Sequence, residues 1–168
     1  MDQNQISILR DSFLNELEQE FQITQRVLSA AATGDKQYRP DSHAKTSFEL
    51  AWHIASSDCW FANAICNGSF EGSDDSPAPS TVSTIADVAT WYQKNFGSAL
   101  EQLRSLSPEA LSKPLNFMGI ATLPAVMYMG WLRSHSIHHR GQLSTYLRPM
   151  GSKVPQIYGG SYDQPFGK

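Results

Sequence analysis

Histidines carry the clearest chemical signal in this sequence. His135 and His139 lie four residues apart, so on a helix their imidazoles project from the same face, one turn apart. This spacing lets two ring nitrogens approach one ion at the ~2.0–2.1 Å of a zinc–histidine bond. A third histidine, His53, lies in a separate amphipathic segment, three residues after Leu50, and shares its apolar face. We therefore predict that His53, His135 and His139 ligate one metal ion.

Other interpretations of these histidines stay open, because short motifs give many false positives. A pair spaced by four residues could form an exposed patch, and a single histidine on an apolar face is more often a hydrogen-bonded core residue. His138 could compete with the predicted ligands, but it is rotated by ~100° from His139 on a helix, so we place it at the rim of the site. His43 precedes the second helical segment, and we place it outside the site.

Three neutral imidazoles leave a coordination position for water or substrate, which is typical of catalytic sites. A bound divalent ion can lower the pKa of a water towards ~7, polarise a substrate oxygen or hold a thiolate. Ser136 occupies the position at which the His-Glu-x-x-His motif of zinc proteases has its general base, so this type of peptidase is disfavoured. Imidazole suits zinc, nickel, iron and copper, so the identity of the metal is open.

Four further residues are candidates for a supporting role around the ion. Glu49 lies one turn before His53 and could accept a hydrogen bond from its second ring nitrogen, although it fits a helix capping box equally well. Gln142 could line the cavity or simply pack, and His138 is placed at the rim. Arg140 could anchor an anionic substrate, but a surface salt bridge is the stronger expectation. The sequence identifies no general acid or base.

Long amphipathic patterns position these residues. Apolar side chains at three- and four-residue steps predict helices at about 6–32, 46–67, 84–107 and 122–148, with a short extra turn near Pro108 and no strand. The Gly- and Pro-rich segment 68–83 is a predicted loop that crosses the end of a bundle. The tail 152–168 contains enough apolar residues to lie against the helices. The sequence thus predicts one all-α domain, residues 1–168, built as a four-helix bundle with an irregular C-terminal tail packed on it.

Composition excludes several classes of protein. Thirteen basic and sixteen acidic residues give a net charge of -3, and no basic stripe indicates a nucleic-acid partner. The longest uncharged apolar stretch, 119–132, is too short to span a membrane, and no signal peptide is evident, so we expect a cytoplasmic protein. Cys59 and Cys66 lie ~10 Å apart on one predicted helix, too far for a disulfide, and we expect both to be reduced.

Three parts of the sequence resemble the DinB/YfiT-like family of metal-dependent enzymes. They are residues 50–55 (LAWHIA), residues 135–143 (HSIHHRGQL) and the ending 146–159, in which YLRPMG closes the last helix. The resemblance covers essentially the whole chain and implies an up-down-down-up four-helix bundle, usually a homodimer. It also implies a divalent ion (zinc, nickel or iron) on three histidines, which correspond to His53, His135 and His139.

The resemblance implies two classes of enzyme acting on small molecules. Some family members resemble hydrolases that use metal-bound water, and others resemble transferases that activate a low-molecular-weight thiol at the metal. Because no protein base is evident, we slightly favour the thiol S-transferase over the hydrolase. The alternative is a non-catalytic, stress-associated metal-binding bundle that works through dimerisation, and a third possibility is that no metal binds.

Overall fold

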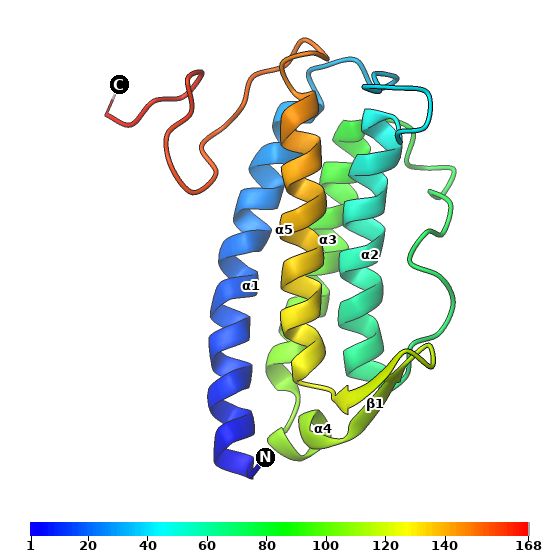
Figure 1. Cartoon of the computed structure of the whole chain (residues 1–168), viewed down its shortest axis with the longest axis vertical. Helices are drawn as coiled ribbons and strands as arrows, with labels where there is room; N and C mark the ends of the chain where they lie inside the picture. Colours follow the sequence, from blue (N-terminus) through cyan, green and yellow to red (C-terminus); the bar gives the residue numbers. More distant parts are fainter. Residues whose placement is uncertain (168) are drawn as a thin grey trace.

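The computed structural model describes residues 1–167, and its core is made of four long helices that lie side by side (Figure 1). Each long helix packs on two others: α2 contacts α3 and α5, and α1 contacts the same two helices. The interior is filled by apolar side chains from all four. The chain is therefore mostly helical, as predicted. The long helices are α1 (Gln3–Ala31), α2 (Ser47–Asn67), α3 (Ile85–Ser105) and α5 (Met127–Tyr146).

Capping residues set the ends of these helices close to the predicted positions. The Thr46 hydroxyl accepts the Glu49 backbone N–H, and the Glu49 carboxylate accepts the Thr46 N–H at 2.7 Å. Thr84 and Asp87 form the same capping box at the start of α3. Gly68 ends α2 in the left-handed conformation, with a φ of 75°, which costs glycine little. A short helix, α4 (Pro108–Ser112), confirms the predicted extra turn.

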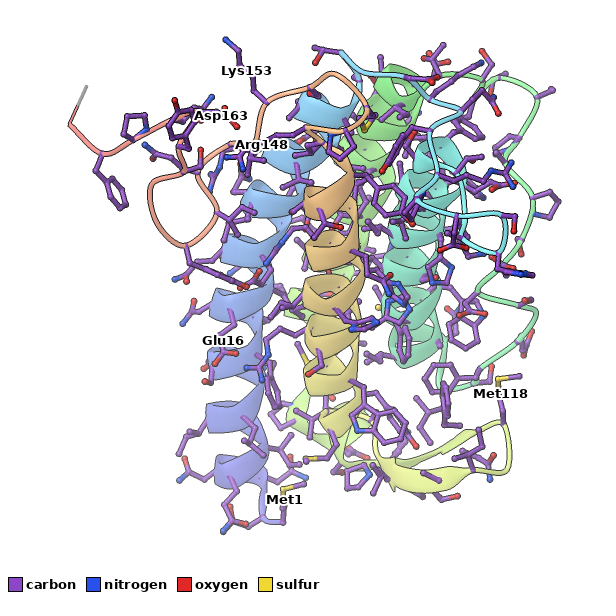
Figure 2. The ribbon with its side chains drawn as sticks, turned by 45° about the horizontal axis from the view of Figure 1, so that its top comes forward. Met1, Glu16, Met118, Arg148, Lys153 and Asp163 are labelled. Carbon is purple, nitrogen blue, oxygen red and sulfur yellow. The ribbon has the colours of Figure 1, made fainter. Side chains whose placement is uncertain are left out.

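A small antiparallel hairpin before α5 corrects the sequence prediction. Its strands, β1 (Pro114–Phe117) and β2 (Ala121–Pro124), include residues that we had assigned to the start of the last helix or to irregular chain. The Tyr128 hydroxyl, buried at the start of α5, donates to the backbone oxygens of Leu115 and Ala121. Strands of four residues show little periodicity of their own, and this pair depends on a side chain outside it. Met118 lies at the exposed tip (Figure 2).

The loop 68–83 does not cross the end of the bundle, as the sequence suggested, but runs along the outer side of α2 (Figure 1). Side chains of α2 hold it there: Trp52 Nε1 donates to the Ser76 carbonyl at 2.6 Å, and Ser56 Oγ donates to the Asp74 carbonyl at 3.1 Å. As a result, every residue of α2 from Leu50 to Cys59 is buried. The middle of α2 is thus covered on both sides.

The C-terminal tail packs on the bundle only in its first part. Val154 and Ile157 are half-buried against the core, whereas Tyr162 is 91% exposed and Phe166 is 70% exposed. An ion pair between Arg148 Nε and Asp163 Oδ2, at 3.0 Å, ties the tail to the end of α5 (Figure 2). The prediction of a packed tail is therefore wrong for its later half, and its last residue lies outside the described chain.

Two expectations from composition agree with the structure. Cys59 and Cys66 are both free thiols. Within residues 1–167, no helix is both long enough and apolar enough to cross a membrane.

Candidate metal centre

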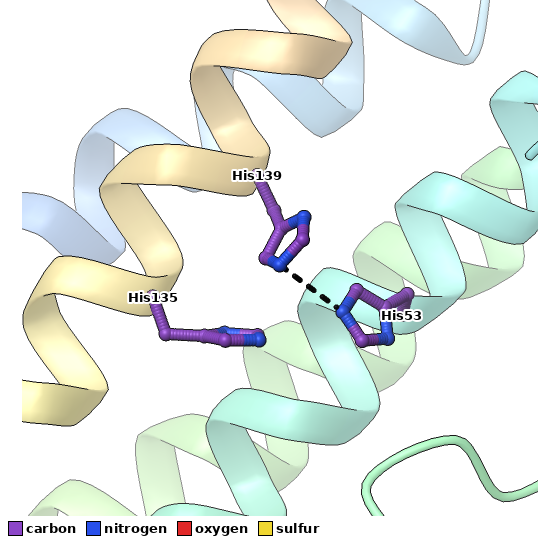
Figure 3. Close-up of side chains that lie close together, drawn as sticks. All are labelled: His53, His135 and His139. Atoms are coloured by element: carbon purple, nitrogen blue, oxygen red, sulfur yellow. Dashed lines mark hydrogen bonds between the residues drawn. The ribbon is translucent and has the colours of Figure 1, made fainter. Parts of the chain in front are cut away.

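Packing of α2 against α5 brings the three predicted ligands together (Figure 3). His53 lies in the middle of α2, and His135 and His139 lie one turn apart on α5. One ring nitrogen from each histidine lies within 4.8 Å of the others. The Nε2 atoms of His53 and His139 are 3.3 Å apart, the separation of roughly 3.3–3.4 Å that two nitrogens adopt on a tetrahedral zinc ion. The three side chains are close enough to hold one metal ion.

Burial favours the neutral form of these imidazoles. His53 is only 8% exposed, and desolvation lowers its pKa, with a further contribution from His135. Desolvation is also the main reason that the pKa of His139 falls to about 4. A metal ion binds the neutral imidazole, so near neutral pH it would not have to displace the extra proton of an imidazolium at His53 or His139. His135 and His139 are only half-buried, which leaves one side of the cluster open.

The hydrogen bonds of His139 determine which of its nitrogens is free. Its Nδ1 lies 2.8 Å from Gln142 Oε1, and the Gln142 amide nitrogen lies 3.2 Å from His138 Nε2. In this orientation the Gln142 oxygen can only accept, so the contact requires the proton on His139 Nδ1 and leaves Nε2 with a lone pair. Gln142 therefore orients His139, and His138 contacts the site through Gln142 from an exposed position at the rim.

His53 is held in a similar way by Ser57 on α2 and by Asp75 in the loop outside that helix. Its Nδ1 lies 3.3 Å from Ser57 Oγ and 3.5 Å from Asp75 Oδ1. Ser57 Oγ also donates to the Asp74 carbonyl, so its oxygen is free to accept from His53. Lys45 Nζ lies 3.0 Å from the same Asp75 oxygen, and this hydrogen bond is the main reason that the pKa of Asp75 is lowered. Both contacts are satisfied when the proton of His53 is on Nδ1, which is the tautomer that they favour.

With the two imidazoles in these tautomers, the contact between His53 and His139 is unfavourable unless a cation lies between them. With both protons on Nδ1, neither Nε2 can donate, so the 3.3 Å contact drawn in Figure 3 brings two acceptors together. A cation between two lone pairs turns this unfavourable contact into coordination. The donor set therefore fits a metal ion, and among residues 1–167 no carboxylate or thiol joins the three histidines.

The contacts of Glu49 match one of the two roles considered from the sequence, whereas those of Arg140 differ from what the sequence suggested. The Glu49 carboxylate accepts the Thr46 N–H of the helix cap, which is the second of the two roles proposed for it. The expectation of a surface salt bridge for Arg140 is wrong: Arg140 is 1% exposed and pairs with Glu20 on α1 at 2.5 Å. It follows His139 directly, so it points about 100° away around the helix. Tyr158 from the tail accepts a further hydrogen bond from Arg140, at 2.6 Å.

Two carboxylates near the histidines were missed by the sequence reasoning. Asp75 lies in the loop, with no helical spacing to reveal it. Asp58 lies on α2, fully buried, and its Oδ1 is 4.0 Å from His135 Nδ1. An acidic residue five positions after His53, in a helix otherwise rich in apolar residues, was a signal that could have indicated Asp58.

A model of the DinB family matches residues 1–166. The chain belongs to the DinB family. This confirms the resemblance inferred from the histidine strings and the ending of the last helix.

Three proteins from Bacillus species are similar to this DinB-family chain. The crystal structure of a DinB-like protein from Bacillus cereus ATCC 10987 has a TM-score of 0.72 and 26% identity, covering 88% of this chain and 97% of that one. The DinB-like protein YjoA from Bacillus subtilis has a TM-score of 0.71 and 19% identity, covering 92% and 99%. YrdA from Bacillus subtilis strain 168, an uncharacterized protein, is 28% identical over 150 residues, which is 89% of this chain and 87% of YrdA. These similarities establish the fold, and any chemical activity has to be inferred from the residues of the site.

Proposed function

We propose that this DinB-family protein binds one divalent metal ion through His53, His135 and His139 and uses it as an enzyme acting on a small molecule. The observation that carries the proposal is the pair of Nε2 acceptors, on His53 and His139, that face each other at 3.3 Å. Zinc, nickel and iron are the candidate ions, because imidazole suits each of them. The four long helices would form an up-down-down-up bundle, and the path of the chain in Figure 1 supports this order.

A bound divalent ion supplies Lewis acidity, which can polarise a substrate oxygen or stabilise a thiolate. The protein's own residues would hold the ion and orient the imidazoles that ligate it. Gln142 keeps the proton of His139 on Nδ1, and Ser57 with Asp75 does the same for His53. The half-buried edges of His135 and His139 leave the approach for a small substrate on the open side of the cluster.

Transfer of a low-molecular-weight thiol to an electrophilic acceptor is favoured over hydrolysis. Hydrolysis calls for a base that accepts a proton from the attacking water. In the described part of the chain, the nearby carboxylates Asp58 and Asp75 lie beside Nδ1 atoms, and Glu49 is bound to its helix cap. A thiol that ionises readily needs no such base. The reaction proposed is therefore attack of the thiol sulfur on an electrophilic carbon of the acceptor. A C–S bond forms while the bond from that carbon to its leaving group breaks, the leaving group departs with the bonding electron pair, and the thiol proton passes to solvent.

A panel of small thiols with an electrophilic acceptor tests the proposed reaction. We expect a thioether product, detected by mass spectrometry, that depends on added divalent metal. His139→Ala should abolish the product, while His43→Ala, which changes an exposed histidine outside the cluster, should not. No metal-dependent adduct with any thiol in the panel would contradict the transferase proposal.

A non-catalytic metal-binding bundle is the second candidate, and the lack of a positioned base within residues 1–167 favours it. In that case the ion would be inert towards thiols and other small ligands. Cobalt substitution distinguishes the two, because its visible spectrum changes when an exogenous thiol enters the coordination sphere. We also propose a homodimer for either candidate, to be checked by light scattering of the purified protein.

A further inference from the structure

A carboxylate with no assigned role lies inside the bundle, beside the histidines. Asp58 is completely buried on α2. Its Oδ2 accepts two hydrogen bonds, from Tyr92 on α3 at 2.8 Å and from Ser136 on α5 at 2.9 Å. Side chains from three helices therefore meet at this one oxygen, and they fix the orientation of the carboxylate.

The other oxygen of Asp58 faces a histidine. Asp58 Oδ1 and His135 Nδ1 are both buried and both lack a hydrogen-bond partner, and they lie 4.0 Å apart. Buried polar atoms without partners are rare, so two that face each other point to one shared interaction. The separation exceeds the ~3.2 Å of a formed N–H···O bond, and a small rotation of the His135 ring would close it.

We propose that Asp58 is a positioning residue for His135, accepting its Nδ1–H and leaving Nε2 as the ligand nitrogen. This inference rests on the proposed metal site and completes it. Gln142 faces Nδ1 of His139, and Ser57 with Asp75 faces Nδ1 of His53. With Asp58, each ligand has its own acceptor, and all three Nε2 atoms are left free to coordinate.

The hydrogen bonds of Asp58 separate this role from a purely structural one. Holding Tyr92 and Ser136 requires a single acceptor oxygen, which an asparagine amide would also provide. Only a carboxylate offers a second acceptor to His135. In an Asp58→Asn variant, the amide oxygen would keep both hydroxyl bonds, while its NH2 group would face His135 and favour the proton on Nε2.

The tautomer of His135 in the metal-free wild-type protein is the first test. Long-range ¹H–¹⁵N NMR at mildly alkaline pH, where imidazoles are neutral, distinguishes a protonated Nδ1 from a protonated Nε2. The signals are assigned by comparison with His135→Gln. We expect the proton on Nδ1. A His135 ring protonated mainly on Nε2 would overturn the proposal, whether or not any variant folds.

Metal affinity of two matched variants is the second test. Asp58→Asn should weaken zinc binding by about 10–100-fold in a chelator competition and shift the His135 proton to Nε2. Tyr92→Phe removes one of the two hydroxyls from Oδ2 but keeps the Ser136 hydrogen bond and leaves Oδ1 in place, so it should weaken zinc binding much less than Asp58→Asn does. Equal affinity in wild type and folded Asp58→Asn, or an equal loss in both variants, would contradict the positioning role. Failure of the metal site itself would appear separately, as a wild-type protein that binds no zinc.

Discussion

At the scale of single residues, the centre depends on which nitrogen of each imidazole carries the proton. Gln142 and the pair Ser57 and Asp75 hold the protons of His139 and His53 on Nδ1, away from the cluster. Desolvation then lowers the pKa of both histidines and disfavours a second proton. In the metal-free protein, the Nε2 lone pairs of His53 and His139 are thus kept unprotonated and close together, which lowers the free energy of unfolding.

Acid should therefore destabilise the metal-free protein through His139. Burial lowers its pKa from 6.5 to about 4. Between these two values the His139 imidazole is protonated in the unfolded chain and neutral in the folded chain. The stability present above pH 6.5 is lost as the pH falls towards 4, and the loss then levels off. Urea unfolding in the presence of a chelator, across this range, should show a shallower pH dependence for His139→Gln than for the wild type. Identical pH dependence in both would rule out this effect.

Loss of Gln142 should weaken metal binding without unfolding the protein. Gln142→Ala removes the acceptor that keeps His139 Nε2 unprotonated, so zinc affinity should fall by about 10–100-fold. Gln102→Ala, an exposed substitution on α3, serves as the control and should leave the affinity unchanged. Chelator competition measures both, and a Gln142→Ala protein with wild-type affinity would show that the hydrogen bond is dispensable.

At the scale of elements, the sequence predicted what local spacing determines. The pair His135 and His139 and the neighbouring Gln142 follow from helical spacing over two turns, and the capping boxes mark the starts of α2 and α3. Contacts between elements were harder to foresee. Asp58 meets His135 across two helices, and Asp75 arrives from the loop that covers α2. The hairpin was missed for the same reason, because the hydroxyl of Tyr128, on the following helix, stabilises it.

The packing of α1 against α5 should depend strongly on the buried ion pair between Arg140 and Glu20. Arg140→Met would leave the Glu20 carboxylate buried without its partner, at a cost of about 3–5 kcal/mol in the free energy of unfolding. The double variant Arg140→Met, Glu20→Met should recover most of this loss, because it removes both charges. Urea unfolding tests the pair, and a double variant no more stable than Arg140→Met would contradict this explanation.

At the scale of the whole molecule, the proposed metal site would join the two halves of the bundle. His53 comes from α2, which packs on α3, while His135 and His139 come from α5, which packs on α1 and α2. An ion bound to all three would connect segments that are distant in the sequence. Its binding should therefore be coupled to the stability of the entire fold.

Divalent metal should raise the thermal stability of the whole chain in a single transition. An ion that binds only the folded state adds about 2.7 kcal/mol at a concentration of 100 times its Kd. Differential scanning calorimetry with increasing zinc should show a rising Tm for the wild type and little change for His53→Ala. An equal rise in both would indicate binding elsewhere on the protein.

Elemental analysis of protein purified without a histidine tag tests the central claim most directly. We predict one divalent ion per chain in the wild type and in His43→Ala. The ion should be lost in His53→Ala, His135→Ala and His139→Ala, which remove the three nitrogens that meet at the centre. Undiminished metal content in these three variants, while they remain folded, would contradict the three-histidine site.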